Sequence, residues 1–154
     1  MDLRDLYQDV ILDHARSPRN SRRLLAPSHL AHGHNPLCGD RITVFMLVAD
    51  DRIQDISFEG RGCAISTASA SLMTEILSGK TLAQARLMFD AFHARVTTGE
   101  MVPLPADLDD DQDRLEPLTG VRSFPARVKC ATLAWHACDA AVTGGLVAEA
   151  VKTE

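Results

Sequence analysis

The sequence predicts an α+β fold in which a small antiparallel β-sheet packs against several helices. Three observations lead to this expectation. Apolar residues recur at helical spacing near both ends of the chain and again after residue 63, whereas one compact region, 41–60, has the composition and alternation of two adjoining strands. With 154 residues, of which 45% are hydrophobic and 24% charged, the chain is expected to form a single globular domain over 1–154.

The first expected element is a helix. Apolar residues near the N-terminus follow helical spacing: Leu3, Leu6, Val10 and Ile11. Asp2 is a candidate N-cap and Pro18 lies beyond the end, which predicts a helix over about 3–15. Residues 17–37 are rich in serine, proline, asparagine and histidine, and they predict a long irregular connection with room for one short strand.

A β-hairpin is expected next. Residues 41–48 are rich in β-branched and aromatic residues, and Asp50-Asp51 is a plausible turn. Ile56 and Phe58 then alternate with polar neighbours, as they should in a strand with one buried face. These features predict an antiparallel pair that ends at Gly60.

The remainder is expected to be helical. One apolar stripe runs from Ala64 to Leu77 and is closed by Gly79, and Thr81 and Gln84 have the spacing of a capping box. The acidic, proline-bearing stretch 99–120 predicts an insertion that forms a surface excursion with a short helix. Pro125 opens the last helix, which is expected to continue through about Val142.

Charge and hydropathy narrow the classes of partner. The formal net charge is -5 and no block of lysine or arginine occurs, which argues against nucleic acid. The first 20 residues carry charges throughout and no apolar stretch of about 20 residues follows, so neither a signal peptide nor a membrane span is expected. A soluble cytoplasmic protein is therefore expected. Thiols stay reduced in the cytoplasm, so the four cysteines are interpreted as metal ligands, reactive groups or core residues rather than disulfides.

Three of these cysteines and one aspartate could meet. Cys38 and Asp40 lie two residues apart in an extended segment and can face one point, although Asp40 could equally be a turn residue. Cys63 lies where a strand gives way to a helix, whose N-terminal dipole favours a thiolate; a small buried residue is the other reading. Cys130 and Cys138 are about 12 Å apart on one helix and cannot share an ion, so Cys138 is assigned to the core. The other three thiols with the carboxylate suit tetrahedral zinc, or iron with a labile fourth ligand.

Several nearby residues have two readings. His32 and His34 could bind metal, but histidines in a loop more often face solvent. Arg127, one turn before Cys130, either neutralises the anionic site or is a solvated helix charge. Trp135 and Phe124 are expected to pack in the interior.

Four segments together resemble the IscU/SufU family of iron–sulfur cluster assembly proteins: "LYQDVILDHARSPRN", "NPLCGD", "GRGCAISTASAS" and "RVKCATLAWHA". The resemblance covers nearly the whole chain. It implies a small antiparallel sheet packed by helices, and it maps the family's metal-binding positions onto four residues: Cys38, Asp40, Cys63 and Cys130.

Two features resemble the SufU branch in particular. Lys129 stands where IscU-type scaffolds carry histidine, and the acidic stretch 99–120 falls where SufU proteins carry an insertion. The resemblance implies a zinc-dependent sulfurtransferase, hence an enzyme, in which Cys38 accepts persulfide sulfur from a PLP-dependent, SufS-like cysteine desulfurase. A downstream iron–sulfur scaffold would then receive the sulfur. Two alternatives remain open: a scaffold holding a transient iron–sulfur cluster, and a non-catalytic module in which zinc only stabilises the fold.

Overall fold

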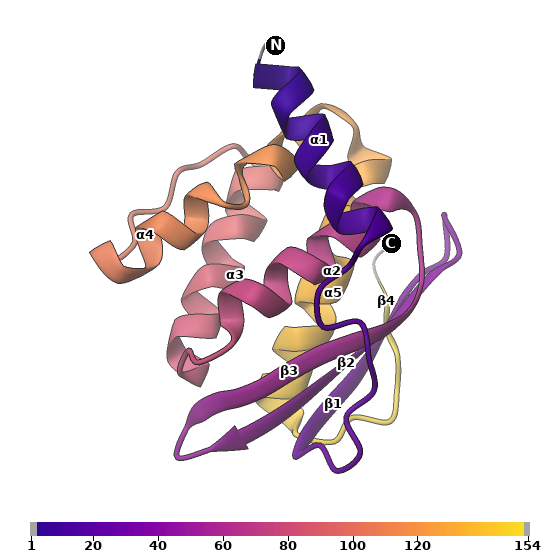
Figure 1. Ribbon diagram of the computed structural model, residues 1–154, viewed down its shortest axis with the longest axis vertical. Coiled ribbons are helices and arrows are strands. Elements are labelled where there is room, and N and C mark those ends of the chain that lie inside the picture. Colours follow the sequence, from indigo (N-terminus) through magenta and orange to yellow (C-terminus); the bar gives the residue numbers. More distant parts are fainter. Residues whose placement is uncertain (1–2, 153–154) are drawn as a thin grey trace.

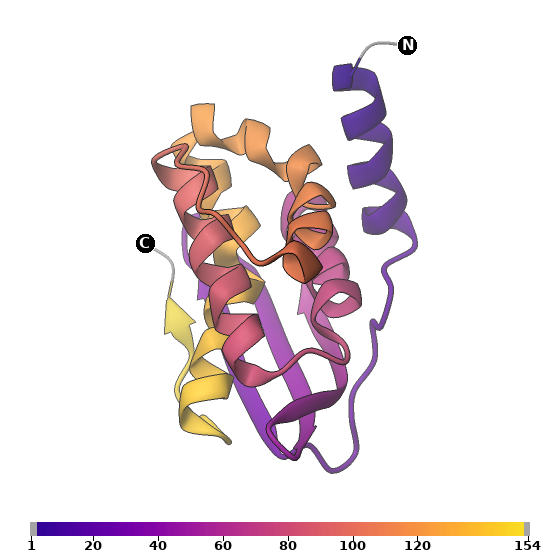
Figure 2. The same ribbon diagram turned by 90° about the vertical axis from the view of Figure 1, so that its left-hand side faces the viewer.

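The computed structural model describes residues 3–152, and its helices cover one face of a β-sheet (Figures 1 and 2). The elements follow the chain in this order: α1 Leu3–Arg16, β1 His29–Asn35, β2 Asp40–Ala49, β3 Arg52–Arg61, α2 Ala64–Leu77, α3 Leu82–Thr97, α4 Ala106–Asp113, the 3₁₀ helix η1 Glu116–Ser123, α5 Pro125–Gly144 and β4 Val151–Lys152. Helices α2 and α5 pack directly on the sheet, and α1, α3 and η1 pack on these two helices. The expected α+β class is confirmed.

The sheet has the strand order β3-β2-β1-β4. The pairs β1–β2 and β2–β3 are antiparallel, as expected, whereas the short β4 runs parallel to β1 and makes the sheet mixed. The hairpin between β2 and β3 turns at Asp50 and Asp51, whose φ angles of 53° and 62° are those of a turn with two left-handed central residues. The strand that the sequence left open within 17–37 is β1.

Backbone hydrogen bonds join irregular segments to two strands of the sheet, the edge strand β3 and the first residues of β1, which β4 does not cover. At the β3 edge, Asn20 and Arg22 exchange bonds with Phe58, at 3.0 and 2.9 Å. At β1, the Leu30 N–H donates to the carbonyl of Gly145 at 2.9 Å. The Leu30 carbonyl accepts from the Val147 N–H at 2.8 Å. Two irregular segments therefore continue the hydrogen-bond pattern on either side of the sheet.

The core lies between the sheet and the layer formed by α2 and α5. Trp135 of α5 is fully buried, and its indole N–H donates to Ser69 Oγ of α2 at 3.2 Å. Ser69 Oγ in turn donates to the Ala131 carbonyl at 2.5 Å, so a short polar chain joins the two helices inside the core. Cys138 is 3% exposed, which confirms its assignment to the core. Phe124, in contrast, is 63% exposed, and the expectation that it packs in the interior is wrong.

The acidic stretch 99–120 is only partly what the sequence suggested. It contains the expected short helix, α4, followed by η1, yet three of its leucines are no more than 2% exposed: Leu108, Leu115 and Leu118. Ion pairs attach it to the helices before it, since Arg95 meets Glu116 at 2.7 Å and Lys80 meets Asp111 at 3.0 Å. Aspartates dominate its sequence, but its leucines complete the core.

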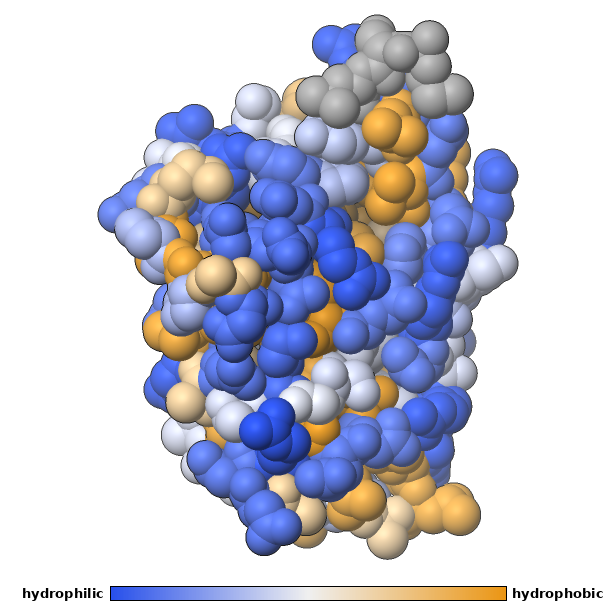
Figure 3. All heavy atoms as spheres, turned by 60° about the vertical axis from the view of Figure 1, so that its left-hand side comes forward, coloured by the Kyte–Doolittle hydropathy of each residue, from blue (hydrophilic) through white to orange (hydrophobic). Residues whose placement is uncertain are grey.

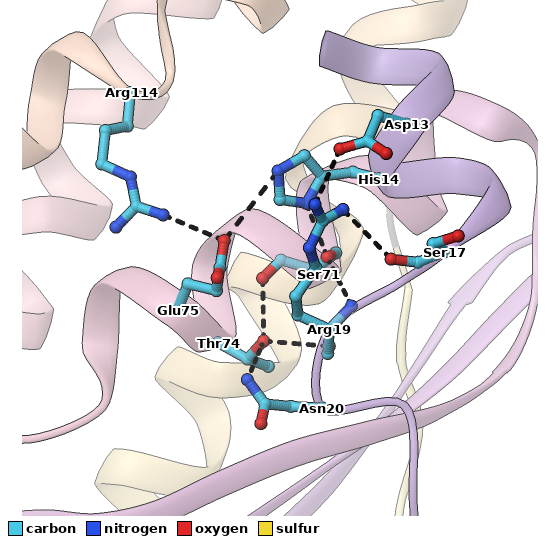
Figure 4. Close-up of polar contacts among 9 residues, drawn as sticks. All are labelled: Asp13, His14, Ser17, Arg19, Asn20, Ser71, Thr74, Glu75 and Arg114. Atoms are coloured by element: carbon cyan, nitrogen blue, oxygen red, sulfur yellow. Dashed lines mark hydrogen bonds and ion pairs between the residues drawn. The ribbon is translucent and has the colours of Figure 1, made fainter.

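A polar network fastens α1 to α2 (Figure 4). Ser71 Oγ accepts from the Arg19 N–H at 2.9 Å and lies 2.7 Å from His14 Nδ1. Glu75 lies 3.9 Å from His14 Nε2 and accepts from Arg114 at 2.9 Å. Burial lowers the pKa of His14, so the neutral imidazole is favoured. The neutral ring shares one hydrogen bond with Ser71 Oγ through Nδ1, and its other nitrogen lies toward Glu75.

The capping box expected at α3 is confirmed, because Gln84 N donates to Thr81 Oγ1 at 3.1 Å and Thr81 N donates to Gln84 Oε1 at 2.9 Å. On the face that Figure 3 shows, hydrophilic side chains dominate, and hydrophobic ones gather mainly near the N-terminal end of α1 and at the opposite end of the molecule. Within residues 3–152, no helix is long and apolar enough to cross a membrane.

Candidate metal centre

Three parts of the chain meet at one end of the sheet. They are the tight turn between β1 and β2, the junction between β3 and α2, and the second turn of α5. These parts carry all four of the residues expected to bind metal: Cys38, Asp40, Cys63 and Cys130. Residues 92 positions apart in the sequence, Cys38 and Cys130, come within 3.5 Å at their sulfur atoms.

The turn between β1 and β2 presents Cys38 to solvent. Gly39 N donates to the Asn35 carbonyl at 2.8 Å, and Gly39 has a φ of 73°, which glycine adopts without strain. Of the four cysteines, all of which lie in the described part of the chain, Cys38 alone is exposed. Cys63 is half-buried and Cys130 is buried. The turn therefore makes one thiol of the group accessible to a large partner.

Asp40 is 2% exposed and is held by the backbone at the start of α2. Its Oδ1 accepts from the Cys63 N–H at 3.0 Å, and its Oδ2 lies 3.9 Å from Cys63 Sγ. Cys63 is the N-cap residue of α2 and makes no side-chain cap of its own, so Asp40 supplies the acceptor there. The second carboxylate oxygen stays directed toward the thiols.

The glycines around Cys63 allow this close approach. Gly60 has a φ of 142°, and a side chain there would overlap the backbone of Arg41 on β2. A side chain at Gly62 would overlap the hydroxyl of Ser66, which itself lies 3.7 Å from Cys63 Sγ. The sequence Gly60-Arg61-Gly62-Cys63 thus places a thiol where the backbone of α2 begins and the turn before β2 comes near.

The donor set fits a tetrahedral cation. Ligand atoms of Cys38, Asp40 and Cys130 all lie within 4.8 Å of one another. Cys63 is not among these three, although its sulfur lies beside the Asp40 carboxylate. Sulfurs bound to one zinc at about 2.3 Å stand about 3.8 Å apart. The Cys38–Cys130 separation of 3.5 Å is close to that value, and Cys63 Sγ lies 3.9 Å from Asp40 Oδ2.

Electrostatics also favour a cation among these groups. The pKa of Cys130 is raised, first by burial and then by hydrogen bonds with Cys38 and Cys63 and by the charge of Cys63. Several thiolates beside a carboxylate repel one another, and a cation bound between them offsets that repulsion. Burial likewise raises the pKa of Cys138 to about 12, but this thiol lies in the core and has no part in the group.

Arg127 is exposed and lies three residues before Cys130 on α5. Hydrogen bonding to Cys130, followed by the charges of Cys63, Cys130 and Cys38, raises the pKa of Arg127. The guanidinium is therefore a solvent-exposed helix charge on which the charges of the thiols act. Lys129, two residues on, instead lines a separate cleft of about 460 Å³ between α3, α5 and β4.

The two histidines near Cys38 do not join the group of three. His32 Nδ1 lies 2.8 Å from Thr43 Oγ1 on the neighbouring strand. Asn35, which lies in the segment "NPLCGD", was not singled out from the sequence as a contact of the thiols, and it directs its amide nitrogen at Cys130 Sγ, 3.7 Å away. Nothing in the sequence indicated this contact with α5.

Comparison with known proteins supports the same interpretation of the chain. Residues 6–144 match the family described as NifU-like N terminal domain. The zinc-dependent sulfurtransferase SufU of Bacillus subtilis is 43% identical over 141 residues, which cover 92% of each chain. The iron–sulfur cluster assembly scaffold protein IscU of Streptococcus pyogenes is 38% identical over 140 residues, covering 91% of this chain and 84% of that protein.

Solved structures agree on the fold. A putative iron–sulfur cluster assembly scaffold protein for the SUF system, from Fervidobacterium islandicum, is 28% identical with a TM-score of 0.80, covering 92% of this chain and all of that one. A NifU-like N-terminal protein from Brucella abortus is 25% identical with a TM-score of 0.79, covering 90% of this chain and 92% of that one.

Proposed function

The chain belongs to the family of NifU-like N-terminal domains, and on this premise we propose that it is a zinc-dependent sulfurtransferase. It accepts persulfide sulfur from a PLP-dependent cysteine desulfurase and passes it to a scaffold on which iron–sulfur clusters are built. The reaction belongs in a compartment that keeps thiols reduced, as the cytoplasm does. The similarity to SufU of Bacillus subtilis, over 92% of both chains, supports this activity over others in the family.

One observation carries the proposal: the exposed thiol of Cys38 lies 3.5 Å from the buried thiol of Cys130, within a group that also contains a buried carboxylate. An acceptor of sulfur from another protein has to be reachable by that protein's persulfide. Cys38 meets this requirement, because of the four cysteines in the described part of the chain it alone is exposed.

The metal would be held by Cys38, Asp40, Cys63 and Cys130. When bound there, zinc supplies the charge that keeps its thiol ligands deprotonated at neutral pH and adds no redox chemistry of its own. Asp40 stays anchored to the Cys63 N–H through one oxygen, so it can remain in place when Cys38 reacts. Arg127 adds a positive charge on which the charges of the thiols act.

Sulfur transfer then needs one displacement. The thiolate of Cys38 attacks the outer sulfur of the cysteine persulfide on the desulfurase. A sulfur–sulfur bond forms to Cys38 Sγ, the persulfide bond of the desulfurase breaks, and the desulfurase cysteine leaves as a thiolate. One sulfur atom moves and no net electrons are transferred, which suits a site without a redox partner.

The alternative function is an iron–sulfur assembly scaffold, the role named for IscU of Streptococcus pyogenes. The residue type at position 129 favours the sulfurtransferase, because IscU-type scaffolds carry histidine there and this chain carries a lysine, which lines the cleft between α3 and α5. Metal analysis of protein purified without added metal separates the two functions. One zinc per chain supports sulfur transfer, and iron accompanied by sulfide supports scaffolding.

The acceptor is tested by mass spectrometry after incubation with a cysteine desulfurase and cysteine. We expect one added sulfur on Cys38 of the wild-type protein, none on Cys38→Ser, and an unchanged amount on Cys138→Ala, whose thiol is buried in the core. Cys38→Ser should keep its fold, since the side chain is exposed. A persulfide on Cys63 or Cys130 with Cys38 unmodified would show that the acceptor is wrongly assigned.

A further inference from the structure

We infer that Asn35 is a positioning residue of the thiol group, whose side-chain amide fixes the turn carrying Cys38 relative to the sulfur of Cys130. The inference rests on the proposed function, because that function gives the thiols their metal. The contacts of Asn35 are the observations that support it. Asn35 is the last residue of β1, its exposed fraction is 0%, and it pairs with Asp40 across the turn. A buried amide at this point has to be fully hydrogen-bonded, so its partners decide what it does.

The amide oxygen holds the turn. Leu37 N donates to Asn35 Oδ1 at 3.2 Å, while Gly39 N donates to the Asn35 main-chain carbonyl at 2.8 Å. Pro36, between Asn35 and Leu37, has no N–H to contribute. Both hydrogen bonds enclose Cys38 and set the direction in which its side chain leaves the turn.

The amide nitrogen faces the other side of the group. Asn35 Nδ2 lies 3.7 Å from Cys130 Sγ, a hydrogen-bonding distance for sulfur. The orientation of the amide is determined, because the Leu37 N–H can only donate and therefore requires the oxygen. An N–H donor directed at sulfur fixes where the sulfur lies and covers it on that side.

The Asn35 amide therefore links the turn that carries Cys38 to Cys130 of α5, which lies 95 positions after Asn35 in the sequence. If the amide is lost, the Cys38 turn and α5 are held together at this point only by contacts of the exposed turn itself. Residues that orient metal ligands from behind typically change metal affinity by about 10- to 100-fold when they are removed. We expect a change of that size at Asn35.

Two substitutions separate the roles of the oxygen and the nitrogen. Asn35→Ser keeps an oxygen that can accept from Leu37 N but cannot reach Cys130, and Asn35→Ala removes both contacts. The control is Asn20→Ser, which removes a half-buried amide whose nitrogen donates to Thr74 Oγ1 at 3.1 Å, far along α2 from the thiols.

Zinc affinity is measured with full-length protein by competition against a chromophoric chelator, with zinc as the only added ligand. We expect Asn35→Ser and Asn35→Ala to bind zinc about 10- to 100-fold more weakly than the wild type, and Asn20→Ser to stay within about threefold. If Asn35→Ser binds as the wild type does, Asn35 is a turn residue alone and the inference is overturned.

A second measurement needs no metal. In metal-free protein, alkylation of each thiol by a small maleimide is followed by mass spectrometry, and we expect Cys130 to react several-fold faster in both Asn35 variants than in wild type or Asn20→Ser. Equal rates overturn the inference even if the wild type binds no zinc. Absence of zinc binding by the wild type, with faster Cys130 alkylation in the variants, would instead overturn the proposed function and leave the positioning role supported.

Discussion

Asp40 divides its two carboxylate oxygens between the fold and the candidate metal centre. Oδ1 accepts from the Cys63 N–H at 3.0 Å and so completes the start of α2, while Oδ2 faces the thiols. The first role needs only an acceptor, whereas the second needs a negative charge. The two roles can therefore be separated by substitution.

We predict that Asp40→Asn and Asp40→Ala both weaken zinc binding, because each removes the anionic oxygen ligand. Only Asp40→Ala should also destabilise the metal-free protein, by about 1 kcal/mol, since asparagine can still accept from the Cys63 N–H. Chelator competition measures the first effect, and urea unfolding of metal-free protein measures the second. Wild-type zinc affinity in Asp40→Asn would mean that the carboxylate has only the structural role.

At this scale the sequence predicted those residues whose role follows from local spacing. Cys38 and Asp40, two apart in an extended segment, are brought to one group with Cys130, and Cys138 lies in the core. Asn35 could not be assigned its contact, because that contact depends on how α5 packs against the turn. Phe124 was expected to pack rather than to dock a partner, and it is exposed because it precedes α5 at the surface.

Among the elements, the segment formed by α4 and η1 differs most from its expected character. Aspartates and prolines suggested an excursion over the surface, but Leu118 of η1 has an exposed fraction of 0%. Leucines spaced among acidic residues gave no continuous helical stripe, and which of them is buried depends on α3 and α5, against which η1 packs.

We predict that Leu118→Ala lowers the free energy of unfolding by about 2–5 kcal/mol, since it empties a closely packed position in the core. Leu25→Ala is the matched control, because Leu25 is 98% exposed and its removal should change stability by less than about 0.5 kcal/mol. Urea denaturation followed by circular dichroism gives both values. If the two variants are equally stable, the segment formed by α4 and η1 is a surface excursion, as the sequence suggested.

Elements with strong local signals were predicted well. The hairpin of β2 and β3 and the capping box of α3 each follow from residues a few positions apart. β4 was not expected, because two residues are too few to show an alternating pattern and their strand character comes from pairing with Gly33 and His34. Tertiary context alone makes that segment a strand.

Across the whole molecule, two histidines give stability a defined pH dependence. Burial is the largest cause that lowers the pKa of His14, which also faces Arg19, Arg114, Glu75 and Asp13. Burial likewise lowers the pKa of a second histidine in α5, His136, whose charged neighbours are His93 and Asp139. A lowered pKa in the folded state means that the unfolded chain binds protons more readily.

We therefore predict that the contribution of these histidines to stability is fully present above the unfolded pKa of about 6.5 and is lost as the pH falls through the lowered folded values. Urea unfolding of metal-free protein at a series of pH values between 7.5 and about 5 should show this decline. His14→Gln should flatten it, because glutamine can keep a polar contact with Ser71 without binding a proton. If the free energy of unfolding of His14→Gln falls with pH as that of the wild type does, groups other than His14 cause the pH dependence.

The partly occupied edges of the sheet bear on how such a protein meets its partners. A strand edge with free N–H and C=O groups can extend into another molecule by strand addition, and thereby start aggregation. Here the chain itself uses some of those groups, through Asn20 and Arg22 at β3 and through Leu30 with the residues after α5 at β1. Strand addition by another molecule is blocked at these positions, whereas the turn that carries the exposed Cys38 stays open to a partner that docks without extending the sheet.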